Sequence, residues 1–184
     1  MAASLTSFNP GTSDLKSTSL EAAVIELASK LQGHENSAIS DDPASPSNLN
    51  VSFDTEPAEC SITATIPITV TINPTAGRPT MVAGKWILSS GTAAYTTFTK
   101  GDGDLDAPNL ESAFVEALVR LQIAEQEAIE SNPDSPNNVS ITFDTDALEM
   151  SVTATLPMTF SVDGTTGAPV FVAAAYIDES TPPG

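Results

Sequence analysis

Two stretches of strict alternation between apolar and polar residues give the clearest structural signal in this chain. In residues 60–72 every second side chain is apolar, with Ser, Thr or Pro between them, and residues 150–162 repeat the pattern. A period of two predicts β-strands that turn one face toward a core and the other toward solvent. Pro67 and Pro157 lie near the middle of these strands and cannot donate to a ladder. Each strand is therefore expected to lie at an edge, to carry a bulge, or to bend into another sheet at its proline.

Apolar residues at helical spacing precede each of these strands. The first stripe runs from Leu20 to Leu31 and the second from Leu110 to Leu121, which predicts two amphipathic helices. Loops rich in Pro, Ser and Asn follow and end both helices, because proline cannot continue a helix. A short strand, the long alternating strand, a turn and a last strand come next in both places. The order helix–strand–strand–strand thus occurs twice.

The repetition extends to individual residues. Residues 14–90 align with residues 104–180 without a gap, and 32 of the 77 positions are identical. A single unit of this size is close to the limit at which one core is stable, so we expect the two units to share a core, as in a fused homodimer. The predicted fold class is α+β, a tandem duplication whose mainly antiparallel β-rich halves, each covered by one helix, are related by a pseudo-two-fold axis. Residues 1–13 are then an N-terminal arm without a counterpart, 91–103 a linker and 181–184 a tail.

The chain is strongly acidic, with 24 acidic and six basic residues and a net charge of −18. Proteins that bind nucleic acid or anionic membranes need clustered Lys and Arg, so neither partner is expected. The sequence has no run of about 20 apolar residues and no basic, apolar leader, which predicts a soluble protein made in a cytoplasm. The single cysteine, Cys60, falls on the apolar side of its strand and is predicted to be a core residue.

The alternating acids Asp102, Asp104 and Asp106 are similar to the start of a calcium-binding loop. An EF-hand loop counted from Asp102 requires Gly at its sixth position and Glu at its twelfth. Ala107 and Ala113 occupy these positions. A solvated acidic linker is therefore the favoured interpretation, with a simple cation site as the alternative.

Two further carboxylate clusters and the single histidine are the other candidates for chemistry. Paired carboxylates cleave glycosides when they are held a defined distance apart, but both clusters flank turns, where acids are common, and aromatic platforms for sugars are few. His34 has no Ser or Cys motif to work with. We therefore predict no catalytic residue, no cofactor-binding residue and no metal ligand, and a protein that is not an enzyme. The two clusters are Asp54, Glu56 and Glu59, and Asp144, Asp146 and Glu149.

The polar face of the long strands is unusual because it carries no charge in so acidic a chain. One interpretation is that Thr simply suits an exposed pleated face. The other is that the face is a contact surface, since an uncharged flat strand invites pairing unless something covers it. On the second interpretation, the predicted partner contacts are Phe8 of the arm together with Thr63, Thr65, Thr69, Thr153, Thr155 and Thr159.

The overall organisation of residues 14–180 resembles that of the decoration, or cement, proteins of tailed-bacteriophage capsids, although no sequence motif carries the resemblance. The resemblance implies a non-enzymatic structural protein of a virion, made in the host cytoplasm, that binds and reinforces the capsid surface. Its partners would be the major capsid protein and a further copy of itself, and a pseudo-two-fold molecule suits a place where two equivalent capsid surfaces meet. The alternative is a soluble binding module that recognises a carbohydrate or a protein through its Pro-rich loops. A soluble hydrolase is the third hypothesis.

Overall fold

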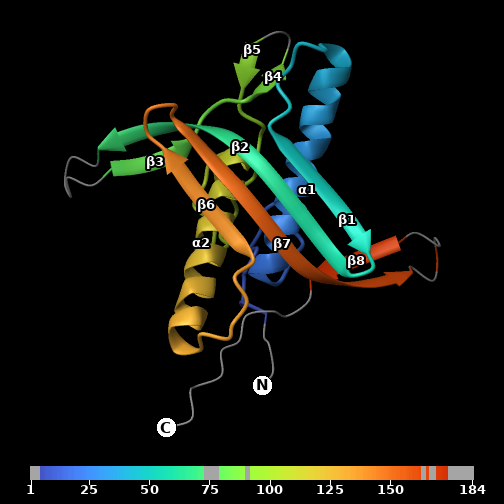
Figure 1. Cartoon of the computed structure of the whole chain (residues 1–184). Helices are drawn as coiled ribbons and strands as arrows, with labels where there is room; N and C mark the ends of the chain where they lie inside the picture. The colour runs from blue at the N-terminus through green and yellow to red at the C-terminus, as the bar shows by residue number, and fades with distance from the viewer. Residues whose placement is uncertain (1–4, 73–78, 90–91, 163–164, 166–168, 174–184) are drawn as a thin grey trace.

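The computed structural model describes residues 5–72, 79–89, 92–162, 165 and 169–173, and within them it shows a mixed α+β fold (Figure 1). The predicted tail, residues 181–184, and the first four residues of the predicted N-terminal arm lie outside the described residues. Two helices alternate with antiparallel strands, as the sequence predicts. The elements are α1 (Leu20–Asp41), β1 (Leu49–Thr55), β2 (Ala58–Ile72), β3 (Pro79–Ala83), β4 (Ile87–Ser89), β5 (Thr92–Ala94), α2 (Leu110–Ser131), β6 (Val139–Asp144), β7 (Glu149–Val162) and β8 (Pro169–Ala173).

The two long strands β2 and β7 pair with each other in the middle of the main sheet, whose order is β1-β2-β7-β6. Their antiparallel register runs from Glu59 opposite Pro157 to Pro67 opposite Glu149, with Thr63 opposite Thr153 at its centre. Strands β1 and β6 pair with the outer sides of β2 and β7. The central pair therefore joins a strand from the first half of the chain to one from the second half.

Each long strand changes partner at its proline. Strand β2 pairs with β7 as far as Pro67 and with β3 from Ile68 onward. Strand β7 pairs with β2 as far as Pro157 and with β8 from Met158 onward. The third of the predicted alternatives, in which the strand leaves one pairing for another at its proline, is thus confirmed.

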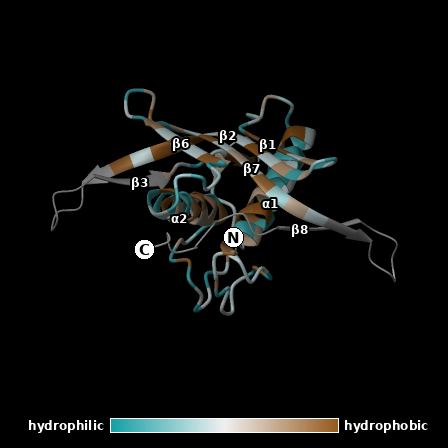
Figure 2. Ribbon diagram, turned by 60° about the horizontal axis from the view of Figure 1, so that its bottom comes forward, coloured by the Kyte–Doolittle hydropathy of each residue, from teal (hydrophilic) through white to brown (hydrophobic). Residues whose placement is uncertain are grey.

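Both helices cover the same face of the main sheet and contact each other (Figure 2). Each begins at a side-chain cap, because the Ser19 hydroxyl accepts from the Ala22 N–H and the Asn109 amide oxygen accepts from the Ser112 N–H. Such caps satisfy N–H groups that the first helical turn leaves free. The helices end at Asp41 and Ser131, two residues before a proline.

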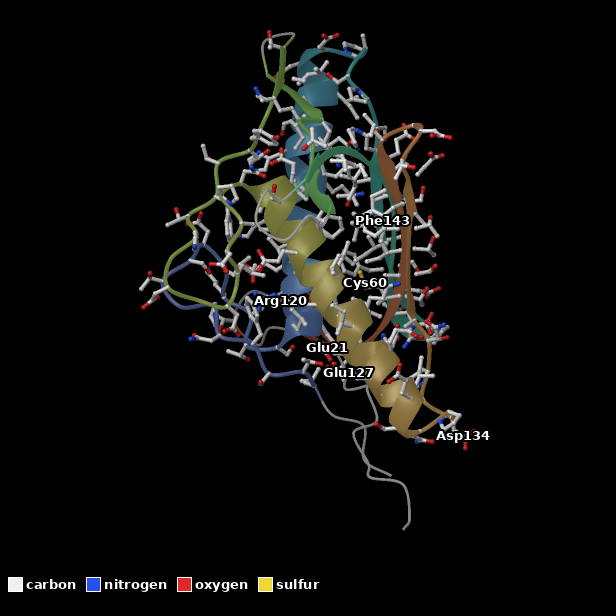
Figure 3. The ribbon with its side chains drawn as sticks, turned by 90° about the vertical axis from the view of Figure 1, so that its left-hand side faces the viewer. Glu21, Cys60, Arg120, Glu127, Asp134 and Phe143 are labelled. Atoms are coloured by element: carbon white, nitrogen blue, oxygen red, sulfur yellow. The ribbon has the colours of Figure 1, made fainter. Side chains whose placement is uncertain are left out.

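The buried apolar side chains form one core between the helices and the sheet. Helix and strand residues from both halves of the chain contribute, so the core is shared as expected. Cys60 is fully buried and points from the sheet toward the helices (Figure 3). Burial raises the pKa of its thiol to about 12, which agrees with the predicted core role. The largest fully buried apolar side chains are Leu27, Leu31, Ile62, Ile66, Phe114, Leu118, Leu121, Met150 and Leu156.

The N-terminal segment differs from the predicted free arm. Phe8 is only 7% exposed and belongs to the core, and the Thr6 carbonyl accepts from the Leu20 N–H. Phe98, 90 positions later, is buried as well. Phe8 is therefore unavailable to a partner in this conformation, which corrects its prediction as a contact residue. The free energy gained by burying the aromatic ring exceeds the conformational entropy that the segment loses when it becomes ordered.

We expect Phe114→Ala to lower the free energy of unfolding by about 3–5 kcal/mol, because it empties a large volume in the shared core. Trp86 lies in the first half of the chain and Phe114 in the second, so Trp86 fluorescence and far-ultraviolet circular dichroism should report one common, shifted urea transition. Thr142→Ala, at an exposed position of β6, is the matched control and should change stability by less than about 0.5 kcal/mol. Two separate transitions would show that the halves have independent cores.

Candidate interaction surface

The main sheet has an open face on the side away from the helices, and the side chains at the centre of this face are hydroxyls and one amide. Asn50, Thr63, Thr153 and Ser140 form one row across the four strands. Parallel rows lie on either side, and most of these side chains are exposed. We call this surface the hydroxyl face. It consists of Asn50, Ser52, Ser61, Thr63, Thr65, Ser140, Thr142, Ser151, Thr153 and Thr155.

The strand pattern explains why these side chains gather there. Successive residues of a strand point to opposite faces, so burial of Ile62 and Ala64 against the helices turns Thr63 and Thr65 outward. Thr also suits a half-buried pleated surface because its branched side chain is stiff. The same alternation in β7 brings Thr153 beside Thr63 across the central pair.

The predicted contact residues are only partly brought together. Thr63, Thr65, Thr153 and Thr155 lie in the centre of the hydroxyl face. Thr69 and Thr159 are also exposed, but they lie beyond the prolines, opposite β3 and β8. These two threonines therefore extend the surface at its two ends and do not join its centre.

A shallow hollow of about 370 Å³ lies at one side of the hydroxyl face, where the loop before β1 meets the centre of the sheet. Its lining includes Ser47, Asn50, Thr65 and Ser151. Hydroxyl and amide groups both donate and accept hydrogen bonds. This surface can therefore bind donors or acceptors of a partner without any change in its own protonation.

The two carboxylate clusters lie at opposite ends of this sheet. Asp54 accepts a hydrogen bond from the Glu56 N–H at 2.9 Å, and Asp144 accepts from the Asp146 and Ala147 N–H groups at 2.9 and 3.0 Å. Hydrogen bonds from these two N–H groups lower the pKa of Asp144. Both aspartates thus stabilise tight turns, and the structure does not bring the two clusters together as a catalytic pair.

The acids of residues 102–106 are engaged with the N-terminal segment. Asp102 accepts from the Thr12 N–H and Asp104 from the Asn9 N–H, both at 2.7 Å. In the reverse direction, Asp14 accepts from the Thr99 N–H at 2.6 Å. These reciprocal hydrogen bonds lock the two segments together, and they lower the pKa of Asp14 and Asp102. The acids that were predicted to lie in a solvated linker therefore hold two segments of the chain together by hydrogen bonds.

Four glutamates that the sequence analysis missed belong to the helices and are buried. Glu35 accepts from the Asn48 and Leu49 N–H groups, and Glu125 accepts in the same way from Asn138 and Val139. Glu21 and Glu111 accept from the N–H and hydroxyl of Thr6 and Thr96 respectively. Glu21 and Glu35 each recur 90 residues later on the apolar face of a helix. This recurrence could have identified all four from the sequence.

These glutamates hold the start of a strand or of a helix-entry segment against the core. Burial raises the pKa of Glu35, Glu111 and Glu125, although the backbone N–H donors act in the opposite direction. Each carboxylate satisfies backbone donors that would otherwise be left without an acceptor near the core. Their role is structural, since none faces the open side of the sheet.

His34 lies on the wall of a groove of about 680 Å³ between α1 and the β4–β5 hairpin. Asp41 and Asp42 share its helix side, and Ile87 and Tyr95 share the other. The Tyr95 hydroxyl donates to the Ala83 carbonyl, so the ring is held in place. The groove has carboxylates on one wall and mostly apolar side chains on the other. The Ser37 hydroxyl, which also lines it, donates to the Gly33 carbonyl.

No protein-family model, curated protein or solved structure matches this chain. Among the described residues, no helix has the length and apolarity that crossing a membrane requires. Within the same ranges, no group of three or more His, Cys, Asp or Glu side chains is arranged to hold a metal ion.

We expect Glu125→Ala to lower the free energy of unfolding by about 2–4 kcal/mol, because the Asn138 and Val139 N–H groups lose their acceptor. Glu130→Ala, on the exposed side of the same helix, is the matched control and should have little effect. Urea denaturation at neutral pH measures both. A loss below about 0.5 kcal/mol for Glu125→Ala would mean that water replaces the carboxylate without cost.

The pH dependence of the same site follows from linkage. A carboxyl whose pKa is raised by folding holds its proton more tightly in the folded state. Glu125 therefore adds stability below its unfolded pKa of about 4.5 that is lost as the pH rises through the folded value. Over the pH window that opens at about 4.5, we expect the stability of the native protein relative to Glu125→Gln to fall as the pH rises. A relative rise over this window would mean that the ionised form is the better bound one.

Proposed function

We propose that the chain is a tandem duplication whose halves are related by a pseudo-two-fold axis passing between Thr63 and Thr153. These residues are 90 positions apart and face each other at the centre of the β2–β7 register. The hydrogen bonds of Glu35 recur at Glu125. The reciprocal bonds between the segments around Asn9 and Thr99 support the same relation.

We further propose that the protein is a non-enzymatic structural protein of a virion, which binds and reinforces the capsid surface as a decoration protein. The observation that carries this proposal is the hydroxyl face. It is four strands wide, exposed and uncharged, in a chain whose net charge is −18. Bringing hydroxyls into a contact costs far less free energy than bringing in carboxylates, because a buried charge must be compensated.

The partner we propose is the major capsid protein. The remaining acids keep the protein soluble and discourage contact with nucleic acid. The hydroxyl face itself carries no charge, so a partner can cover it without burying an unpaired carboxylate. The resemblance of the whole-chain organisation to capsid decoration proteins points to the same partner.

A soluble binding module is the second candidate, and the groove beside α1 is the observation that favours it. Its volume of about 680 Å³ is within the range of small-ligand sites. Tyr95 offers an aromatic surface, while Asp41 and Asp42 offer acceptors for sugar hydroxyls. Ligand-dependent quenching of Trp86 fluorescence by a carbohydrate library, lost in Tyr95→Ala, would support this candidate.

We expect the native protein to sediment with megadalton particles, and purified protein to bind these particles again after removal. The double variant Thr63→Asp, Thr153→Asp should bind at least 100-fold more weakly, because it places two unpaired carboxylates in the contact. Ser37→Asp, on an exposed site of α1, is the control and should bind normally. Circular dichroism checks that each variant is folded.

Two results would contradict the proposal. If the native protein runs as a free chain of 19.0 kDa or as a small oligomer, the virion assignment is wrong. If it binds particles but the Thr63→Asp, Thr153→Asp variant binds equally well, the hydroxyl face is not the contact.

A further inference from the structure

We infer that the surface bound by the hydroxyl face is itself two-fold symmetric, formed where two identical partner subunits meet, and that each subunit presents basic side chains to one end of the sheet. This inference rests on the proposed function. It adds the chemistry and the stoichiometry of the partner. It also gives the two exposed carboxylate clusters a common role.

Negative charge is concentrated at the two ends of the main sheet. Asp54, Glu56 and Glu59 surround the β1–β2 turn, and the corresponding acids surround the β6–β7 turn. Because β2 and β7 are antiparallel, these turns lie at opposite ends of the central pair. Glu59 is eight residues from Pro67, which faces Glu149, so the two ends are roughly 26 Å apart along the strand. Along the strands, the surface therefore carries three acids at one end, an uncharged centre, and three acids at the other end.

The sequences of β1, β2, β6 and β7 contain no lysine or arginine. The ion pairs that the structure records among the described residues involve Lys30, Lys100 and Arg120, none of which belongs to these strands. A partner that covers the sheet would therefore bring basic groups to both ends.

The size of the hydroxyl face limits what it can bind by itself. With five residues in each of β2 and β7 and three in each of β1 and β6, the hydroxyl face has a footprint on the order of 250 Å². A stable protein–protein contact covers about 800 Å² on each partner. The hydroxyl face alone is too small, so a stable contact extends along the sheet over its ends, where the acids are exposed.

The charge pattern of the sheet is the same at both ends. The arrangement of acids at one end is repeated at the other, about the same centre between Thr63 and Thr153. A single asymmetric partner would have to carry two unrelated basic patches at matching distance. Two identical subunits that meet on a two-fold axis present such a pair automatically. One copy of this chain is then bound for every two partner subunits.

The experiment neutralises two acids at one end of the sheet or at the other. It measures binding of each variant to particles from which the native protein has been removed. One variant is Asp54→Asn with Glu56→Gln, and the other is Asp144→Asn with Asp146→Asn. Asn keeps the side-chain oxygen that accepts the turn N–H groups, so both turns should form. Glu127→Gln with Glu130→Gln changes the net charge equally, but on α2, on the helix side of the sheet (Figure 3).

We expect each end variant to bind roughly fivefold more weakly, by the same factor at both ends, and the α2 variant to bind as the native protein does. The difference should shrink as salt is raised, because these contacts are exposed and screened. Saturation should occur at one chain for every two partner subunits. Unequal losses at the two ends, no loss at either end, or saturation at one chain for each subunit would overturn the inference while leaving the proposed function intact. Failure of the native protein to bind the particles would instead remove the proposed function.

Discussion

The antiparallel pairing of β2 with β7 is the interaction on which the rest of the molecule depends. It joins strands that are about 90 residues apart in the chain, and it places Thr63 opposite Thr153. Because alternate residues point to opposite faces, this one register sends the apolar positions of both strands into a common core and the hydroxyls to the open face. A shift of a single residue would reverse both faces, so core and surface are specified together.

Carboxylates rather than cations organise the segments around this pair. Glu35 and Glu125 fix the starts of β1 and β6, and Asp14, Asp102 and Asp104 join the segments that lead into the helices. Each accepts from backbone N–H groups, so a good part of the negative charge is used within the fold. The strongly acidic composition is thus partly architectural, because many of the acids accept hydrogen bonds from the backbone.

Much of the fold could be predicted from the sequence, because periodicity is a local signal. The alternation in residues 60–72 and 150–162 correctly indicated the long strands, and the apolar stripes indicated both helices. Phe8 could not be placed in this way, since its burial depends on a contact with the rest of the core that no local pattern records. The pairing of β2 with β7 was equally hidden, and with it the grouping of Thr63 with Thr153. The separation of Thr69 from that group follows from the change of partner at Pro67.

The register of the central pair also has a consequence for how the chain folds during synthesis. Until residues 149–157 have left the ribosome, β2 has no partner on its inner side, and a long alternating strand with an open edge is prone to pair with other chains. Because β2 and β7 share the same alternation of apolar and polar residues, the open edge of one nascent chain can pair with that of its neighbour on the same messenger RNA. Linking both halves in one polypeptide raises the effective concentration of the correct partner above that of any neighbouring chain. The covalent link thus protects the strand during the interval in which it is most exposed to mispairing.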